Sequence, residues 1–547
     1  MSTSMTGPSV DVLEGSMGSA AVLVANRGEI AVRVLRSASE AGLRTVAVWA
    51  GDDDAHVRAA DEAVRVGDYL DAEALLAAAE RTGCGLLHPG YGFLSEDAGF
   101  ARRCAAAGVG FVGPSPEVLE VFGDKARARG LAASMGVPVL TGSPGGVGPR
   151  EARELLADGP VMIKAVGGGG GRGMRVVRRV EDLAEAWERC RSEAEAGFGR
   201  GELYVERLLE GARHVEVQVV GDATGAVTHL WDRDCSAQRR HQKLIEIAPA
   251  PGLPAGVREK LLDSALRMAR AARCTSLVTF EFLVRGEEFH FIEANPRLQV
   301  EHTVTEEVTG VDLVAAQLWL AGGGTLAGLG LAGGPAEPRG FAVQARVNAE
   351  VTGADGGVRP SAGRITRFDV PTGPGVRVDT AVRAGVEVGT RYDPLLAKVI
   401  AHVPHGEVGA ACARARRALG EFAVEGVRTG IALVRDVLAR PDFWARPGVV
   451  EEAARAVADA APPAGDGAGE GVVVAPMSGT VVAVGVSPGD VVRAGRQLLV
   501  VEAMKMEHVV RAPGSGVVDA VHARVGETVG EGAVLVTLAG VTEEGAG

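Results

Sequence analysis

PVMIKAVGGGGGRGMRVVR, residues 160–178, places five consecutive glycines between two apolar segments that we expect to be β-strands, 160–166 and 174–178. Because glycine has no side chain, the backbone N–H groups of this run stay open to an anion. A flexible linker is the alternative, but a linker is not expected between two strongly apolar strands. The run is not a Walker A loop, since no Gly-Lys-Ser/Thr follows it. It predicts a phosphate-binding loop, to which Lys164 would add a positive charge unless it is an ordinary strand-end lysine.

The chain before this loop alternates strands with helices. An apolar strand at 21–26 and a second strand at 45–50 flank a helical pattern that stops at Gly42. This order predicts a parallel sheet with crossover helices. Beyond residue 212, a third block alternates long strands with helices and continues to about residue 457. Further helices are expected near 72–81, 95–107 and 181–197, and a further strand at 202–209.

The C-terminal part has a different composition and contains an internal repeat. Residues 457–470, VADAAPPAGDGAGE, lack periodicity and are predicted to be a linker. After them, APMSGTVVAV at 475–484 matches APGSGVVDAV at 512–521 with a shift of 37 residues. This repeat predicts two similar β-ribbons related by a pseudo-two-fold axis. The two copies join at VVEAMKMEHVV, which would place Lys505 at an exposed hairpin tip.

Carboxylates in apolar segments mark a candidate metal site. Glu281 stands alone in VTFEFLV, and a buried carboxylate must be paired, protonated or metal-bound. In FIEANPRLQVEH, residues 291–302, polar and apolar side chains alternate, so an extended chain would place all the polar ones on one face. Glu281, Glu293 and Asn295 offer oxygen ligands that suit Mg²⁺, although strands that face water would show the same patterns. An extended chain would separate Glu293 from Glu301 by about 26 Å, which leaves Glu301 free to act as a general base.

Composition limits the class of protein. The net charge of −13 argues against a nucleic acid partner. The six cysteines form no C-x-x-C pair, so neither a zinc knuckle nor a disulfide framework is indicated, and a cytoplasmic location is the simplest expectation. Glycines interrupt the uncharged stretch 313–336, which predicts a helix and a loop rather than a membrane span. The basic segment 233–243 suits an anionic substrate, although basic surface loops are common.

Nine segments, in order along residues 20–455, resemble biotin carboxylase, an ATP-grasp enzyme. They are ANRGEIAVRV, HPGYGFLSE, GDKARAR, IKAVGGGGGRGMR, RHVEVQV, RDCSAQRRHQK, TFEFL, FIEANPRLQVEH and RVNAE. EAMKM and the 37-residue repeat resemble the biotin carboxyl carrier domain. The resemblance implies an α/β fold with an N-terminal parallel domain, a mobile lid and a C-terminal α+β domain, followed by an all-β flattened barrel of the biotinyl/lipoyl type. The expected boundaries are a disordered leader at 1–19, the N-terminal domain at 20–132, the lid at 133–208, the C-terminal domain at 209–456, the linker at 457–470 and the carrier domain at 471–540.

The resemblance also implies roles for individual residues. Arg297 would bind bicarbonate, Glu301 would deprotonate it, Arg346 would stabilise the biotin enolate, and Lys243 and Gln299 would position the reacting groups. Glu281, Glu293 and Asn295 would bind Mg²⁺ or Mn²⁺, and Lys505 would carry covalent biotin. The residues implied to bind ATP are Lys125, Lys164, Gly167, Gly168, Gly169, Gly170, Gly171, Glu206, Leu209, His214, Gln238 and His241.

The expected reaction is ATP-dependent carboxylation of biotin by bicarbonate through carboxyphosphate. No carboxyltransferase domain fits in the 547 residues, so a separate carboxyltransferase subunit is expected to carboxylate an acyl-CoA. Pyruvate is the alternative acceptor, because EANPR and HTVTE resemble pyruvate carboxylases more closely. A biotin protein ligase and a second copy of the chain, bound through the biotin carboxylase part, are further expected partners; no membrane is expected. A scaffold with an inactive ATP-grasp domain, or a lipoyl rather than a biotinyl domain, is a less favoured hypothesis.

Overall fold

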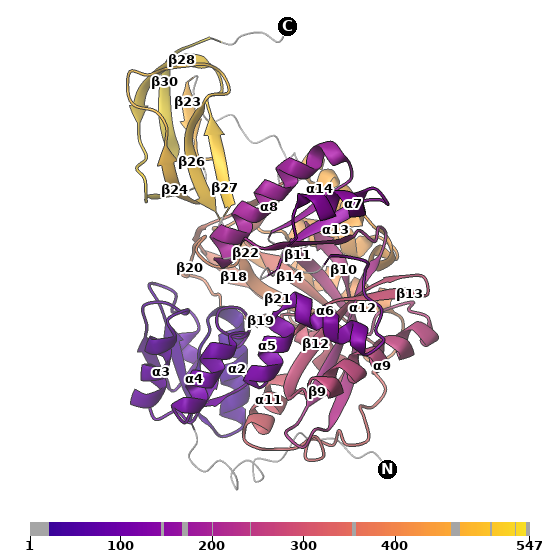
Figure 1. Cartoon of the computed structure of the whole chain (residues 1–547). Coiled ribbons are helices and arrows are strands. Elements are labelled where there is room, and N and C mark those ends of the chain that lie inside the picture. The colour runs from indigo at the N-terminus through magenta and orange to yellow at the C-terminus, as the bar shows by residue number, and fades with distance from the viewer. Residues whose placement is uncertain are drawn as a thin grey trace.

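The computed structural model describes most of the chain and shows the main body with a separate C-terminal lobe (Figure 1). The described residues are 21–143, 147–166, 173–199, 201–240, 242–352, 357–460, 471–477, 479–503, 506–530 and 532–542. The predicted leader and the glycines 167–171 lie outside them, as do His241 and Lys505. No helix in the described part of the chain is long and apolar enough to cross a membrane.

The N-terminal part is the predicted parallel sheet with crossover helices. Its strands run in the order β3-β2-β1-β4-β5, and every neighbouring pair is parallel. Asp71 and Asp97 cap two of the helices by accepting hydrogen bonds from the backbone of the first turn. The elements are β1 (Ala21–Val24), α2 (Gly28–Glu40), β2 (Arg44–Trp49), η1 (Val57–Ala59), β3 (Glu62–Arg65), α3 (Ala72–Arg81), β4 (Leu86–His88), α4 (Ala98–Ala106) and β5 (Gly110–Phe111).

The region predicted as the lid contains a small antiparallel sheet covered by helices. Two connecting helices, α5 (Pro116–Gly123) and α6 (Lys125–Ser134), lead into it. The sheet has the order β7-β6-β8, and the glycine run joins β6 to β7. Trp187 and Cys190 of α8 are buried against this sheet. The elements are α7 (Pro149–Leu156), β6 (Val161–Ala165), β7 (Met174–Val177), η2 (Val180–Asp182), α8 (Leu183–Phe198) and β8 (Leu203–Arg207).

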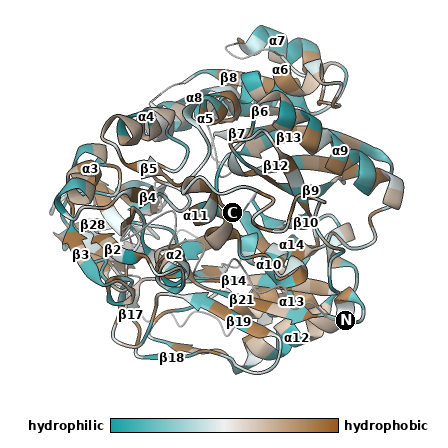
Figure 2. Cartoon of the chain, turned by 90° about the horizontal axis from the view of Figure 1, so that it is seen from below, coloured by the Kyte–Doolittle hydropathy of each residue, from teal (hydrophilic) through white to brown (hydrophobic). Residues whose placement is uncertain are grey.

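An eight-stranded sheet forms the centre of the main body, in the order β13-β12-β9-β10-β11-β14-β21-β19. Its strands are β9 (Arg213–Gly221), β10 (Val227–Arg239), β11 (Gln242–Ala248), β12 (Ser276–Arg285), β13 (Glu288–Asn295), β14 (Phe341–Asn348), β19 (Val376–Thr380) and β21 (Leu395–Val403). Helix α12 packs on β14 and β21, α13 packs on β14, α14 packs on β10, and α9 packs on β9, β10, β12 and β13. Figure 2 shows α12 and α13 beside β21, and α9 beside β9 and β12. The helices here are α9 (Ala255–Ala271), α10 (His302–Thr309), α11 (Leu313–Ala321), α12 (Val408–Glu421), α13 (Ile431–Ala439), α14 (Val449–Ala460) and η3 (Phe443–Ala445). The short strands are β15 (Glu350–Thr352), β16 (Val358–Pro360), β17 (Gly363–Arg364), β18 (Arg367–Asp369), β20 (Glu387–Val388) and β22 (Ala423–Glu425).

Two local predictions were wrong. The polar residues of 291–302 do not share one extended face, because β13 ends at Asn295 and α10 begins at His302. Pro296 follows the last strand residue, and proline cannot donate to the next ladder hydrogen bond. The segment predicted as a linker from residue 457 is helical at its start, since α14 extends to Ala460. Alanines at 458 and 460 favour that continuation.

The C-terminal lobe has the predicted pseudo-two-fold symmetry. Two four-stranded sheets have the orders β23-β30-β28-β25 and β27-β26-β24-β29. The shift of 37 residues relates β24, β25 and β26 to β28, β29 and β30, and the related strands are neighbours in the same order. Strands β26 and β27 pair up to Ala503 opposite Met506, on either side of Lys505. The strands are β23 (Val472–Val474), β24 (Gly479–Val484), β25 (Val491–Val492), β26 (Gln497–Ala503), β27 (Met506–Arg511), β28 (Ser515–Val521), β29 (Thr528–Val529) and β30 (Val534–Thr542).

Candidate active site

A row of charged residues crosses four neighbouring strands of the central sheet. Arg233 on β10 lies opposite Glu216 on β9, which lies opposite Glu281 on β12, which lies opposite Glu293 on β13. Residues directly opposite in a sheet point to the same face. The strand register therefore places three carboxylates side by side. Arg233 and Glu216 are fully buried and form an ion pair of 2.5 Å.

Lys243 joins this row to Glu301. Its ammonium lies 2.7 Å from Glu216, 3.4 Å from Glu281 and 2.6 Å from Glu301. Burial by itself would lower the pKa of Lys243, but the surrounding acidic groups raise it well above its usual range. Burial would raise the pKa of Glu281, but Lys243 and His214 lower it to about 2. Both Lys243 and Glu281 are therefore charged at neutral pH.

Glu301 lies between two cations at the start of α10. One carboxylate oxygen accepts a hydrogen bond from Lys243 at 2.6 Å, and the other accepts one from Arg346 at 3.1 Å. Glu301 is the N-cap residue of α10, but its side chain does not cap the helix. Burial opposes its ionisation, yet Lys243, Arg346 and Arg233 hold its pKa well below the usual range. Both oxygens of Glu301 are therefore engaged, and its predicted role as a general base stays a prediction.

Arg297 lies on the other side of the same turn. Its guanidinium forms an ion pair with Glu96 at 2.5 Å and donates to the side-chain oxygens of Gln299 at 3.0 Å and Asn295 at 3.2 Å. Gln299 is buried, and its amide nitrogen has no hydrogen-bond partner among the described residues. An unsatisfied buried donor beside an arginine is suited to bind a small anion.

The three candidate metal ligands lie together at the end of the carboxylate row. Asn295 donates to Glu281 at 2.7 Å, and Glu293 lies opposite Glu281 on the neighbouring strand. Lys125 forms an ion pair of 3.1 Å with Glu293, and His214 one of 2.6 Å with Glu281. Two carboxylates and an amide oxygen are ligands that Mg²⁺ prefers. The side chains present here therefore fit a magnesium site, with Lys125 and His214 balancing the carboxylate charge.

Two of the candidate nucleotide residues, Lys164 and Glu206, lie on the sheet of the predicted lid. Glu206 on β8 is buried and forms ion pairs with Lys164 on β6 and with Arg129 on α6. Leu209 follows β8 and is partly exposed. The strands β6 and β7 end at the glycine run, which itself lies outside the described residues.

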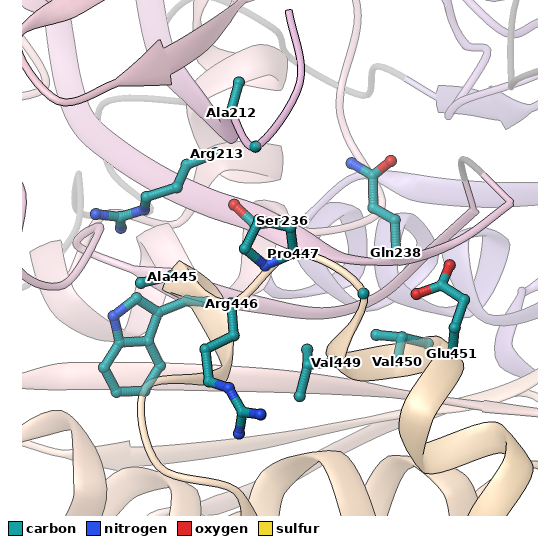
Figure 3. A pocket seen from close by; sticks show the side chains of 13 residues that line it. Ala212, Arg213, Ser236, Gln238, Ala445, Arg446, Pro447, Val449, Val450 and Glu451 are labelled. Carbon is teal, nitrogen blue, oxygen red and sulfur yellow. The ribbon is translucent and has the colours of Figure 1, made fainter. Parts of the chain in front are cut away.

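A pocket continues this region toward the C-terminal helices. The side-chain amide nitrogen of Gln238 donates a hydrogen bond of 2.8 Å to the ring nitrogen Nδ1 of His214, and Gln238 lines the pocket in Figure 3. Arg446, Val450 and Glu451 line the opposite wall (Figure 3). The pocket brings together residues more than 200 positions apart in the chain.

Several residues of the site were missed by sequence reasoning. Glu216 and Glu246 are isolated acids in apolar strands, the same signal that identified Glu281, and this signal could have found them. Glu246 is fully buried and accepts a hydrogen bond from Arg346 at 2.6 Å. Arg233 was noted only as part of the basic segment 233–243, and Arg129 carries no such signal, because its partner Glu206 lies on a distant segment.

Comparison with known proteins assigns every main part of the chain to a family. The family descriptions that match are "Biotin carboxylase, N-terminal domain" at residues 19–119, "Carbamoyl-phosphate synthase L chain, ATP binding domain" at 124–329, "Biotin carboxylase C-terminal domain" at 344–448 and "Biotin-requiring enzyme" at 471–538. Pyruvate carboxylase of Schizosaccharomyces pombe is 46% identical over 438 residues, and human mitochondrial pyruvate carboxylase is 45% identical over 438 residues. These matches cover 77% and 78% of the chain, which spans only 37% of the length of each of these relatives.

Solved structures are similar over the same parts. The biotin carboxylase domain of Hydrogenobacter thermophilus 2-oxoglutarate carboxylase, in complex with MgADP and bicarbonate, is 40% identical with a TM-score of 0.74. The match covers 79% of the chain and 97% of that domain. A single-chain, multi-domain long-chain acyl-CoA carboxylase is 45% identical with a TM-score of 0.72, over 96% of the chain and 51% of its own length.

Proposed function

The chain belongs to the biotin carboxylase family of ATP-dependent ligases, and from this premise we propose that it carboxylates a biotin carried on its own Lys505 and supplies the carboxyl group to a carboxyltransferase. Biotin, ATP, magnesium and bicarbonate are the cofactors and substrates of such a site. The observation that carries the proposal is Glu301 held between Lys243 and Arg346, next to Arg297 and the unsatisfied amide of Gln299.

In the proposed reaction, Arg297 and Gln299 bind bicarbonate and Glu301 removes its proton. A carboxylate with a low pKa is a weak base. An anion bound beside Glu301 would oppose the field of Lys243 and Arg346 and raise the pKa of the carboxyl group, which strengthens it as a base. The two cations would then stabilise the negative charge that develops as bicarbonate attacks the terminal phosphate of ATP.

The remaining residues have supporting roles in this proposal. Glu281, Glu293 and Asn295 would hold magnesium, which neutralises phosphate charge when it is bound with the nucleotide. Lys125 would then leave Glu293 for the phosphates. Attack of bicarbonate on the terminal phosphate would release ADP and form carboxyphosphate, which would break down to CO₂ and phosphate. The phosphate would take the proton from the ureido nitrogen of biotin, Arg346 would stabilise the negative charge left on the biotin ring, and that nitrogen would then attack CO₂. A biotin protein ligase and a second copy of the chain stay predicted partners.

The comparisons favour pyruvate over an acyl-CoA as the final acceptor. The curated relatives named above are pyruvate carboxylases, which supports pyruvate, the alternative acceptor, more than the acyl-CoA that was expected first. We therefore propose that a carboxyltransferase for a 2-oxo acid such as pyruvate receives the carboxyl group. An acyl-CoA is the second candidate, because the acyl-CoA carboxylase structure is similar over both the carboxylase and the carrier parts.

The half-reaction is tested with the purified biotinylated chain. We expect ATP hydrolysis that depends on bicarbonate and increases with free biotin. Glu301→Gln should lower this rate at least about 100-fold, as expected for loss of a general base. Absence of bicarbonate-dependent hydrolysis in the wild-type chain would contradict the proposal.

The acceptor is tested by capture of the biotinylated chain from native extract on monomeric avidin. The captured material is offered ATP, labelled bicarbonate and either pyruvate or acetyl-, propionyl- and branched acyl-CoA thioesters. Label fixed only on pyruvate, with a TIM-barrel carboxyltransferase in the eluate, supports the proposal. Label fixed on a thioester, with a crotonase-like subunit, moves the assignment to an acyl-CoA carboxylase.

A further inference from the structure

A second row of charged residues crosses the other end of the central sheet. Lys398 on β21 lies directly opposite Arg346 on β14 and directly opposite Asp379 on β19. The three side chains therefore point to the same face of the sheet. Helix α10 packs on this face, across β14 and β21, and Glu301 immediately precedes it. The row thus lies directly beneath the turn that carries Glu301.

Lys398 is fully buried and contacts the backbone of that turn. Its ammonium donates a hydrogen bond of 3.2 Å to the carbonyl oxygen of Val300, the residue before Glu301. It also lies 2.9 Å from a carboxylate oxygen of Glu29 and 3.9 Å from one of Asp379. A fully buried ammonium is very unfavourable unless it is paired. These contacts supply the pairing, and one of them is the hydrogen bond to the backbone carbonyl of Val300 in the candidate active site.

The carboxylate partner from α2 is held in place as well. Glu29 is buried, and its other oxygen accepts a hydrogen bond from the hydroxyl group of Tyr91. Arg346 and Lys398 are like charges on adjacent strands, so they repel unless carboxylates lie between and beside them. Glu301 and Glu246 pair with Arg346, whereas Glu29 and Asp379 pair with Lys398. The position of each cation is therefore set by a different pair of acids.

We propose that Lys398 is a positioning residue that fixes the peptide group between Val300 and Glu301 and thereby aims the Glu301 carboxylate at bicarbonate. This inference rests on the proposed function. The carbonyl of Val300 belongs to the same peptide unit as the amide nitrogen of Glu301, so its hydrogen bond to Lys398 fixes the orientation of that unit. Displacement of a catalytic group by about 1 Å can reduce a rate by about 100-fold. Lys398 therefore acts on the reaction without touching a substrate.

The competing interpretation is that Lys398 only ties α2 to the central sheet through its ion pair with Glu29. Two variants separate the two interpretations. Glu29→Gln removes that ion pair but leaves the bond from Lys398 to Val300. The double variant Lys398→Met/Glu29→Gln removes the bond as well, without leaving Glu29 as an unpaired buried charge. Thermal melting of each variant establishes that it is folded at the assay temperature.

The measurement is bicarbonate-dependent ATP hydrolysis, with separate KM values for bicarbonate and ATP. We expect the double variant to lose at least about tenfold in kcat/KM for bicarbonate, with KM for ATP within about twofold of wild type. Glu29→Gln should retain kcat/KM for bicarbonate within about threefold of wild type. Lys398→Arg keeps the charge but places a larger group in a fully buried site against Val300, so kcat/KM for bicarbonate should fall, although less than in the double variant.

Wild-type bicarbonate kinetics in the folded double variant would overturn the role of Lys398, and so would equal losses in the double variant and Glu29→Gln. If the double variant does not fold, Lys398→Arg decides instead: reduced kcat/KM for bicarbonate with unchanged KM for ATP supports the role, and unchanged bicarbonate kinetics contradict it. A wild-type chain without bicarbonate-dependent hydrolysis would refute the proposed function itself, which is a different result.

Discussion

Arg129 on α6 is predicted to control nucleotide affinity through Glu206. Its guanidinium bonds Glu206 at 3.0 Å and the carbonyl oxygen of Leu140 at 2.8 Å, so it links α6 to the sheet of the predicted lid. Only 2% of the Glu206 side chain is exposed, and its second oxygen pairs with Lys164. In Arg129→Met, Glu206 would be a buried carboxylate with a single charged partner, and it would draw Lys164 away from the phosphate site.

The expected magnitude follows from the lost hydrogen bond. A hydrogen bond to a charged group contributes about 1.5–3 kcal/mol, and each 1.4 kcal/mol corresponds to about tenfold in affinity. Because Lys164 still pairs with Glu206, we expect the lower end, which is an increase in the Kd for MgATP of about tenfold. Isothermal titration calorimetry of the purified chain measures this Kd.

Arg127→Met provides a matched control on the same helix. The Arg127 side chain is 64% exposed and its ion pair with Asp124 is 4.0 Å long, so its loss should change the Kd by less than about twofold. The reasoning is refuted if folded Arg129→Met binds MgATP as tightly as Arg127→Met does.

Three further predictions concern stability and modification. Burial would raise the pKa of Asp379, but Arg377 and Lys398 lower it; the resulting stability is full above the unfolded-state pKa of about 3.9 and is lost as the pH falls through the lower folded-state pKa. In urea unfolding, Asp379→Asn should therefore cost about 3 kcal/mol at pH 7 and progressively less below about pH 4. The control Asp369→Asn, at an exposed residue that pairs with Arg367 at 2.7 Å, should cost less than about 0.5 kcal/mol. A difference between Asp379→Asn and wild type that stays constant from pH 7 to pH 3 would contradict this prediction. Leu535→Ala removes a fully buried side chain of the C-terminal lobe and should lower the free energy of unfolding of that lobe by about 2–5 kcal/mol, measured by thermal melting. A decrease below about 1 kcal/mol would show that the surrounding side chains fill the cavity. Lys505→Ala should abolish the mass increase of biotinylation and all transfer to the final acceptor while it spares carboxylation of free biotin, and wild-type transfer by this variant would refute biotin attachment at Lys505.

Local sequence patterns were sufficient for the fold class. Apolar runs separated by amphipathic segments predicted the parallel N-terminal sheet, because period and order depend only on nearby residues. The 37-residue repeat predicted the symmetry of the C-terminal lobe for a similar reason. The errors occurred where tertiary context or a single residue overrode a pattern. The alternation of polar and apolar residues through 291–302 continued past Pro296, although the strand ends at Asn295. The linker was predicted to begin at residue 457, although α14 extends to Ala460.

The sequence by itself determined the family, the order of the parts and the cofactors, because motif residues and spacing are local properties of the chain. It also singled out Glu281, Arg297 and Glu301 as residue types suited to the chemistry, and their catalytic roles stay predictions. Only the tertiary structure decided which charges meet. Strand register aligned Glu216, Glu281 and Glu293 in one row and Asp379, Lys398 and Arg346 in another, and the bend after Asn295 brought Glu301 between Lys243 and Arg346. The physical reason is that a pKa or an ion pair depends on distance in space, and the partners of these groups lie up to 369 residues away in the chain, as for Glu29 and Lys398.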